Sequence, residues 1–328
     1  MEYTTLGDTG LSVSRICLGG MSFGTTDYFD WVLEEDESRE IIERAIDLGI
    51  NFFDTANIYS SGASERILGN VLADYDRDSQ VVATKTHPTR SPEKYPPEGR
   101  GGLSRKAIEQ DLHNSLDRLG MDTVDLYHIH RWDYNTPIEG TLRALDDAVR
   151  RNQVRYLGAS SMWAHQFADG LHTSDRLGLE RFANMQNHYS LAYREEEREM
   201  LPLCQRQGIG VTPWSPLAKG FLTRPHEDIS KTLRGQTDDH LHERPYAEGG
   251  NIEVNERVEE IAAQKGVSMA QIAIAWLLHK EWVDAPIVGV ESIQHLEEAV
   301  EALHINLTDG EIEYLEEPYE PLPITGHE

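Results

Sequence analysis

The feature that most constrains the fold is an alternation, along the whole chain, of short apolar runs with longer stretches of helical spacing. The apolar runs are continuous, which is typical of parallel strands that are buried on both faces. We therefore predict eight strands, at residues 15–18, 51–55, 80–85, 123–129, 154–159, 182–188, 208–212 and 285–288.

Helices are predicted between and after these strands, at residues 37–48, 63–73, 104–119, 137–151, 165–171, 194–206, 255–279 and 293–303. In the third of these, Ser104 is a suitable N-cap and Gly120 lies where a C-terminal glycine belongs. Eight βα units predict an α/β protein with a single domain, residues 1–328, folded as a (β/α)8 TIM barrel. The alternative is an open doubly wound sheet, which usually binds a dinucleotide through GxGxxG after its first strand, and the sequence contains no such motif.

Two long polar segments, 87–102 and 224–250, follow the C-terminal ends of predicted strands. Loops of this length in a compact domain are usually functional or disordered. Barrel enzymes keep their active sites on the loops at this face. We therefore expect long loops around a site at the C-terminal face.

The formal net charge is −27, from 57 acidic and 30 basic residues. This balance argues against nucleic acid as a partner, because a phosphate-binding surface must be basic, and against anionic membranes. The sequence has no apolar stretch long enough to predict a membrane span.

Only seven of the basic residues are lysines, and the acidic residues are dispersed over predicted helix faces instead of forming one tail. Dispersed acidic charge with little lysine suggests the hypothesis of a salt-adapted protein, kept soluble in high salt. The alternative is an ordinary acidic protein of the cytoplasm.

The N-terminus lacks a basic segment followed by an apolar one, so we expect no secretory signal. The two cysteines, Cys17 and Cys204, make no disulfide framework. These features fit the reducing cytoplasm, where we expect the protein. No group of Cys and His residues has the spacing of a zinc site, so we expect no metal.

Four polar residues lie at or just after the ends of three successive predicted strands. Asp54 ends the run NFFD, and Tyr59 follows in the next loop. Lys85 ends the run VVATK, and His130 ends DLYHIH. Because neighbouring strands lie about 5 Å apart, these side chains can meet in one pocket.

These residue types suit the reduction of a carbonyl, because a carbonyl that receives hydride must also receive a proton. Tyr59 is a candidate donor, although the pKa of a free tyrosine is about 10. We expect the Lys85 ammonium to lower that pKa, and Asp54 to hold the buried lysine. His130 is a candidate to orient the carbonyl oxygen by donating a hydrogen bond. Each residue alone is more often structural, so it is their joint placement that indicates chemistry.

Six segments resemble those of the aldo-keto reductases and occur in the family's order: DTANIYSSGASE, VVATK, DLYHIHRWD, VRYLGASS, MQNHYS and TPWSPLAKGFL. The segments YTTLGDTGLSVSRICLGGMSFG and YLEEPYEPLPITGH resemble the aryl-alcohol-dehydrogenase-like branch. The resemblance covers nearly the whole chain and implies the (β/α)8 barrel. It implies a catalytic tetrad with Tyr59 as general acid, made of Asp54, Tyr59, Lys85 and His130. His128 lies where relatives often have glutamine.

The family binds a nicotinamide cofactor across the barrel mouth without a Rossmann motif. The resemblance implies that Ser160 and Gln186 hold the carboxamide together with Ser161, where many relatives have asparagine. It also implies that Trp214 stacks on the nicotinamide ring and that Ser215, Leu217, Lys219 and Gly220 cradle the pyrophosphate, where the alternative for PWSPLAKG is a Pro-rich turn. The complete implied set is Gly20, Met21, Ser160, Ser161, Gln186, Trp214, Ser215, Pro216, Leu217, Lys219, Gly220, Arg234, Gly289, Glu291, Ser292, His295 and Glu298.

The adenosine end of this implied site departs from the family pattern. Relatives often carry Arg or Lys near Glu291 or Ser292, where it pairs with the 2′-phosphate of NADP. Here the carboxylate of Glu291 would repel a phosphate and could accept hydrogen bonds from a free ribose. Arg234 is another candidate to meet the phosphate. The resemblance thus implies NADP as cofactor, with NAD possible because of Glu291.

Four aromatic residues are candidates to line a substrate pocket: Tyr28, Trp31, Trp132 and Tyr134. Aromatic walls favour flat or apolar aldehydes and ketones. The expected partner is a small carbonyl or alcohol substrate, and we expect a monomer or a small homo-oligomer.

The leading hypothesis is an NAD(P)H-dependent reductase of aldehydes or ketones. The first alternative is a cofactor-binding regulatory subunit with little turnover, because the family includes potassium-channel β-subunits that keep the tetrad. The second is a barrel isomerase or lyase without nicotinamide, which does not explain the match at Ser160, Gln186 and Trp214. Turnover of a simple aromatic aldehyde separates the reductase from the regulatory subunit, and absence of any NAD(P)H binding would favour the isomerase or lyase.

Overall fold

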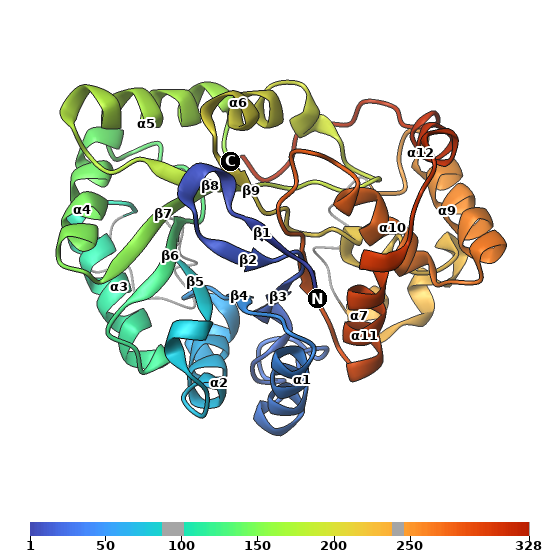
Figure 1. Ribbon diagram of the computed structural model, residues 1–328, viewed down its shortest axis with the longest axis horizontal. Coiled ribbons are helices and arrows are strands. Elements are labelled where there is room, and N and C mark those ends of the chain that lie inside the picture. The colour runs from blue at the N-terminus through green and yellow to red at the C-terminus, as the bar shows by residue number, and fades with distance from the viewer. Residues whose placement is uncertain (87–101, 238–245, 328) are drawn as a thin grey trace.

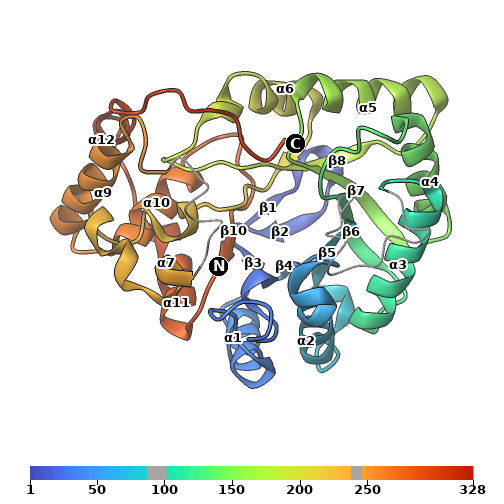
Figure 2. The ribbon, with the colours of Figure 1, turned by 180° about the vertical axis from the view of Figure 1, so that it is seen from behind.

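The centre of the structure, a computed structural model, is a curled sheet of eight parallel strands surrounded by helices (Figure 1, Figure 2). The structure describes residues 1–86, 102–237 and 246–327. The strands run in the order β10-β3-β4-β5-β6-β7-β8-β9. Their bounds are β3 Cys17–Gly19, β4 Phe52–Asp54, β5 Val81–Thr86, β6 Val124–Ile129, β7 Val154–Ser160, β8 Phe182–Gln186, β9 Gly210–Val211 and β10 Ile287–Gly289. Each overlaps one of the eight strands predicted from the sequence.

Backbone hydrogen bonds join the two ends of this strand order. The amide of Asp284 donates to the carbonyl of Val211 at 3.0 Å, and that of Ile287 donates to Pro213 at 2.9 Å. The chain entering β10 is therefore paired with the chain at β9, and the sheet curls on itself. The (β/α)8 barrel predicted from the sequence is confirmed, and the open doubly wound sheet is excluded.

Helices cover the outside of the sheet, with bounds α1 Glu35–Asp47, α2 Ala63–Leu72, α3 Arg105–Leu119, α4 Ile138–Arg150, α5 Ala164–Leu177, α6 Met200–Gln207, α7 Leu233–Thr237, α9 Asn251–Lys265, α10 Met269–Leu278, α11 Ile293–Glu301 and α12 Asp309–Glu316. The predicted ends of α3 are confirmed. Ser104 accepts a hydrogen bond from the amide of Ala107, and Gly120 is left-handed with φ 64°.

The single helix predicted at 255–279 is wrong, because two helices, α9 and α10, fill this segment. Gly266 ends α9 with φ 68°, and Ser268 starts α10 by a capping box with Gln271. In the part of the chain that the structure describes, no single helix is long and apolar enough to cross a membrane; α9 and α10 pass that test only as a pair, which is bent by 99°.

Other predicted helix bounds were also displaced. The predicted 165–171 is the first half of α5, whose second half is too polar to show clear apolar spacing. The predicted 194–206 begins instead as a 3-10 turn, Glu195–Glu197, and becomes α-helical only at Met200. The short α7 and the terminal α12 were not predicted.

An N-terminal hairpin, absent from the prediction, packs against one end of the barrel. Its strands, β1 Tyr3–Thr5 and β2 Ser12–Ser14, pair antiparallel. Leu6 and Val13 are fully buried in a cluster that also contains Phe52 and Leu126 from inside the barrel. The neighbouring residues along β4 and β6 belong to the larger core between sheet and helices. Apolar packing thus fills the N-terminal end of the barrel, and polar residues gather at the C-terminal end.

Two helical glycines test the closeness of this helix packing. A Cβ at Gly69 in α2 would lie 2.3 Å from the carbonyl oxygen of Leu119 in α3, whereas a Cβ at Gly140 in α4 would meet nothing within 4 Å. We predict that Gly69→Ala lowers the free energy of unfolding by about 1–3 kcal/mol through overpacking. The matched Gly140→Ala should raise it by up to about 1 kcal/mol through helix propensity. Urea denaturation measures both, and equal effects would contradict the packing.

Candidate active site

Four polar side chains meet at the C-terminal end of the barrel. Asp54 is the last residue of β4, Lys85 lies near the end of β5, and His130 directly follows β6. Tyr59 begins a 3-10 turn, Tyr59–Gly62, in the loop after β4. The four residues that the sequence singles out for catalysis are therefore close together in space.

The ammonium of Lys85 is the centre of this group. It donates to Asp54 Oδ1 at 2.5 Å, to the carbonyl of Thr55 at 2.7 Å and to Tyr59 Oη at 3.3 Å. These contacts match the three donors of an ammonium group. The side chain is completely buried, and a buried charge is tolerated only when it is paired and hydrogen-bonded in this way.

The pKa values of Lys85 and Tyr59 follow from this burial. Burial lowers the pKa of Lys85, but Asp54 and Tyr59 outweigh it, and the pKa is raised above its ordinary value. Burial also raises the pKa of Tyr59, and Lys85 offsets only part of that effect. The expectation of a lowered Tyr59 pKa is therefore wrong for this structure, because desolvation outweighs the lysine. The phenol stays protonated at neutral pH, which is the form that can donate a proton.

His130 lies beside the phenol of Tyr59. The two rings meet edge to face, with 5.9 Å between their centroids. The amide of His130 donates to the carbonyl of Thr86 at 2.8 Å, which continues the pairing of β5 with β6 past the strand ends. This backbone hydrogen bond fixes the position of the His130 backbone, and with it the point from which the imidazole extends.

His128, two residues before His130, lies inside the barrel. It is fully buried, and its Nε2 is 2.7 Å from Asn184 Oδ1. Gly158 is its partner on β7, where a Cβ would lie 2.2 Å from the imidazole. Burial lowers the pKa of His128 to about 4, so the ring is neutral at physiological pH.

The residues implied to hold a carboxamide lie next to the tetrad. Ser160 ends β7 opposite Gln186, which ends β8. The amide of Gln186 donates to Asp54 Oδ2 at 2.9 Å, so both oxygens of that carboxylate have partners. Ser161 follows, and its hydroxyl accepts from the indole of Trp214 at 2.9 Å.

Backbone strain is concentrated at this end of the barrel. In the described segments, the residues other than glycine that have positive φ lie, with the exception of Asn152, in the loops that follow β4, β7 and β9. The residues in these loops are Ser60, Ser61, Ser161, Ser215, Ala218 and Lys219. Such strain persists where the surroundings over-determine it, typically at functional sites. Gly220 continues the left-handed run with φ 98°. Together with Pro216 and Leu217 this segment forms a tight loop, in which the amides of Ala218 and Gly220 donate to the carbonyls of Ser215 and Leu217.

The residues implied for the adenosine end surround the start of α11. Ser292 caps this helix by accepting from the amide of His295 at 3.2 Å, and Gly289, Glu291 and Glu298 lie within or beside its first turns. Arg234, in α7, reaches across so that its Nη1 is 4.0 Å from Glu291 Oε1. Gly20 and Met21 form the turn after β3, where Ser64 donates to the Gly20 carbonyl at 2.6 Å.

The sequence from residue 15 to residue 320 matches the model of the Aldo/keto reductase family. The chain belongs to the aldo/keto reductase family.

Curated relatives cover nearly the whole chain. Aldo-keto reductase AMT2 of Alternaria alternata is 42% identical over 99% of this chain and 93% of its own length. Versiconal hemiacetal acetate reductase of Aspergillus parasiticus is 42% identical over 99% of this chain and 98% of its own. A Schizosaccharomyces pombe relative whose name describes an aryl-alcohol dehydrogenase is 42% identical over 99% of this chain and 97% of its own. The chain is thus an oxidoreductase similar to the aryl-alcohol-dehydrogenase-like branch.

Aldo/keto reductases generally use nicotinamide cofactors, and the described residues fit such a group. The strained loop at 215–220 carries the cationic side chain of Lys219, and α11 begins with a capped N-terminus; both features favour negative charge. Gly19 and Gly20 have no room for larger residues, because an added Cβ would lie 2.9 Å from Ile287 in β10 at the first position and 2.9 Å from Ser64 in α2 at the second.

The four aromatic residues predicted to line a substrate pocket lie in the loops after β3 and β6. Trp31 is buried beneath Arg234, whose guanidinium lies 4.2 Å from the centre of its ring. Tyr28 packs against Phe29 in the same loop. Trp132 packs against the core, and Tyr134 is 61% exposed.

Sequence reasoning missed Arg131, although it lies directly after His130. Its Nη1 donates to the His130 carbonyl at 2.6 Å, and it is 3.5 Å from Ser160 Oγ. The guanidinium also lies 5.7 Å from the centre of the Trp214 ring. Arg131 therefore adds positive charge between the tetrad and the implied carboxamide residues.

Sequence reasoning also missed the contacts that the C-terminal segment makes with the loops of the barrel. Tyr134 donates to the carbonyl of His327 at 2.9 Å, and the His327 imidazole is 3.1 Å from Glu196 and stacks edge-on against Trp163. These contacts join the loops after β6, β7 and β8 to the last residues of the chain. Only the tertiary structure shows them, because the partners are more than 100 residues apart in sequence.

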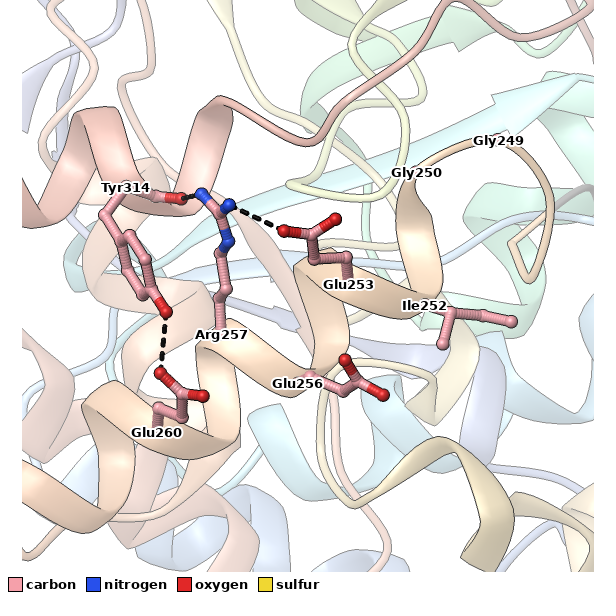
Figure 3. A pocket seen from close by; sticks show the side chains of 8 residues that line it. All are labelled: Gly249, Gly250, Ile252, Glu253, Glu256, Arg257, Glu260 and Tyr314. Atoms are coloured by element: carbon pink, nitrogen blue, oxygen red, sulfur yellow. Dashed lines mark hydrogen bonds and ion pairs between the residues drawn. The ribbon is translucent and has the colours of Figure 1, made fainter.

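A separate hollow of about 430 Å³ lies on the outer surface between α9 and α12 (Figure 3). Arg257 bridges its two sides by donating to Glu253 and to the carbonyl of Tyr314, whose hydroxyl donates to Glu260. No residue predicted for catalysis or cofactor binding lines it.

The buried His128 predicts a pH dependence of stability. Its pKa is about 4 when folded against 6.5 for an ordinary histidine, so between these values only the unfolded chain binds the proton. Its contribution to stability is complete above pH 6.5 and is lost as the pH falls through 4, about 3 kcal/mol in all. His128→Gln should remove this part of the dependence.

Urea denaturation of wild type and His128→Gln from pH 7 to pH 4 measures the difference. The comparison is needed because Asp284 acts in the opposite sense, as burial raises its pKa to about 6. Parallel stability curves for the two proteins would contradict a neutral, buried His128.

Proposed function

We propose that this aldo/keto reductase reduces aldehydes or ketones to alcohols, aryl carbonyls among them, with Tyr59 as the general acid. The observation that carries the proposal is the buried Lys85 ammonium, which bonds both Asp54 and Tyr59. A buried charge linked to a protonated phenol suits proton donation better than it suits a structural role. The names of the relatives, which include reductases and dehydrogenases, support the same reaction class.

The proposed steps use the tetrad as follows. A bound nicotinamide cofactor supplies the hydride. As the carbonyl carbon gains that hydride, its oxygen takes the proton from Tyr59 Oη, and the product is an alcohol. The Lys85 ammonium stabilises the phenolate left behind, and Asp54 keeps Lys85 charged. His130 donates a hydrogen bond that orients the carbonyl oxygen, and water returns a proton to Tyr59.

The cofactor would be held by side chains next to the tetrad. Ser160, Ser161 and Gln186 would bind the carboxamide, and Trp214 would stack on the nicotinamide ring. The strained loop at 215–220 would bind the pyrophosphate. We propose NADP as the cofactor, with NAD also accepted because Glu291 places a carboxylate where a 2′-phosphate would lie.

Tyr59→Phe tests the general acid. We expect turnover of 4-nitrobenzaldehyde to fall about 100-fold to 10,000-fold, while cofactor affinity stays within about twofold, because only the proton donor is lost. The measurement is cofactor oxidation followed by absorbance, at low and high KCl.

The two salt concentrations also test the hypothesis of salt adaptation, because a salt-adapted enzyme loses turnover at low KCl.

The matched control is Tyr3→Phe, which removes an exposed phenol outside the barrel mouth and should leave turnover unchanged. Wild-type turnover by Tyr59→Phe would reject Tyr59 as the acid. Tight cofactor binding by wild type without oxidation of any aldehyde would favour the regulatory-subunit alternative.

Glu291→Arg tests cofactor choice. A guanidinium there would pair with a 2′-phosphate, so we expect the ratio of kcat/KM for NADPH to that for NADH to rise about tenfold or more. Steady-state kinetics with each cofactor measures the ratio. Glu313→Arg, an exposed site on α12 with the same change of charge, is the control and should leave the ratio unchanged. An unchanged ratio in Glu291→Arg would exclude this residue from the phosphate site.

A further inference from the structure

His188 lies between the aromatic rings of Trp214 and Tyr193. One face of its imidazole stacks on Trp214, with 4.2 Å between centroids and 12° between planes. The other face stacks on Tyr193, with 4.0 Å and 10°. His188 and Tyr193 are buried, whereas Trp214 is partly exposed. The three rings therefore form one stack that begins in the core and ends at the barrel mouth.

Each ring of the stack is also held at its edge by a hydrogen bond. The indole of Trp214 donates to Ser161 Oγ at 2.9 Å. His188 Nε2 is 2.8 Å from the hydroxyl of Tyr246, and the hydroxyl of Tyr193 accepts from the amide of Thr325 at 3.1 Å. Stacking fixes the tilt of a ring and an edge bond fixes its rotation in the plane, so the orientation of Trp214 is determined from behind.

We propose that His188 is a positioning residue, which holds Trp214 as a rigid platform for the nicotinamide ring. The nicotinamide would stack on the face of Trp214 that His188 does not cover. The inference rests on the proposed function, because it needs a nicotinamide cofactor in this place. If the Trp214 side chain is already ordered, it loses no rotamer freedom when the nicotinamide ring binds. Less of the favourable stacking energy is then offset by lost conformational entropy. The platform also sets the height and angle of the ring for hydride transfer.

The imidazole does more than a hydrocarbon ring of similar size would do. Its Nε2 gives the buried hydroxyl of Tyr246 a partner, and Tyr246 is 2% exposed. Tyr246 belongs to the chain that follows the strained loop at 215–220, so His188 links the platform to that chain. Phenylalanine would keep the stack without this link, and leucine would lose both.

Substitution of His188 tests the proposal through cofactor affinity. Titrations with NADPH and NADH, followed by cofactor fluorescence, give the Kd of the form that wild type prefers. We expect His188→Leu to raise this Kd about threefold to tenfold, and also to lower kcat at saturating cofactor, because the ring is no longer held at its angle. His188→Phe should raise Kd only about twofold to threefold, since the stack remains and only the bond to Tyr246 is lost.

The control is Phe182→Leu, which removes a buried ring of the same strand region that stacks on Phe167 instead of on Trp214. It should lower the melting temperature and leave Kd within about twofold of wild type. A purely structural His188 would behave like this control. If His188→Leu does not fold, Tyr246→Phe takes its place, with an expected rise in Kd of about twofold to threefold.

The outcomes separate the inference from the proposed function. If wild type binds a cofactor and His188→Leu, or Tyr246→Phe in its place, binds it equally well, the platform role is overturned and the reductase proposal stands. A loss in His188→Phe as large as that in His188→Leu also overturns it, because stacking would then not be the property that matters. If wild type binds neither cofactor, the proposed function fails and the inference fails with it.

Discussion

The buried ammonium of Lys85 is the interaction on which the rest of the active end depends. A charge without solvent needs partners on every donor, and the barrel supplies them from the end of β4 and the loop after it. The same hydrogen bonds fix the positions of the Asp54 and Tyr59 side chains. The burial that forces Lys85 to be hydrogen-bonded also raises the pKa of Tyr59 and keeps its phenol protonated. Burial therefore determines both the arrangement of these side chains and the protonation state of Tyr59.

The two ends of the barrel divide stability and chemistry between them. At the N-terminal end, the hairpin packs Leu6 and Val13 among apolar side chains from inside the barrel. At the C-terminal end, buried polar groups and left-handed non-glycine residues accumulate. Strain of this kind costs of order 1–3 kcal/mol per residue and persists because the surrounding packing holds it. The apolar end and the helix layer supply that packing.

Three contacts join the tetrad to the stack behind Trp214. Gln186 bonds Asp54, its backbone carbonyl accepts from the amide of Ser161 at 3.2 Å, and Ser161 holds the indole of Trp214. Tyr59 and Trp214 therefore belong to one connected network of hydrogen bonds, which runs through Lys85, Asp54, Gln186 and Ser161. A ring that stacks on Trp214 would be placed by the same scaffold that places Tyr59, which is what transfer of hydride and proton to one carbonyl requires.

The sequence by itself determined the eight strands and the tetrad, because buried parallel strands leave continuous apolar runs and each tetrad residue lies at or near a strand end. It also contained Gly266 and Ser268, the local signals that divide α9 from α10. Tertiary structure alone decided the net pKa shift of Tyr59, the partners of Arg131 and the stack at His188. The physical reason is that strands and caps arise from neighbours in sequence, whereas desolvation and ring stacking depend on groups that only folding brings together.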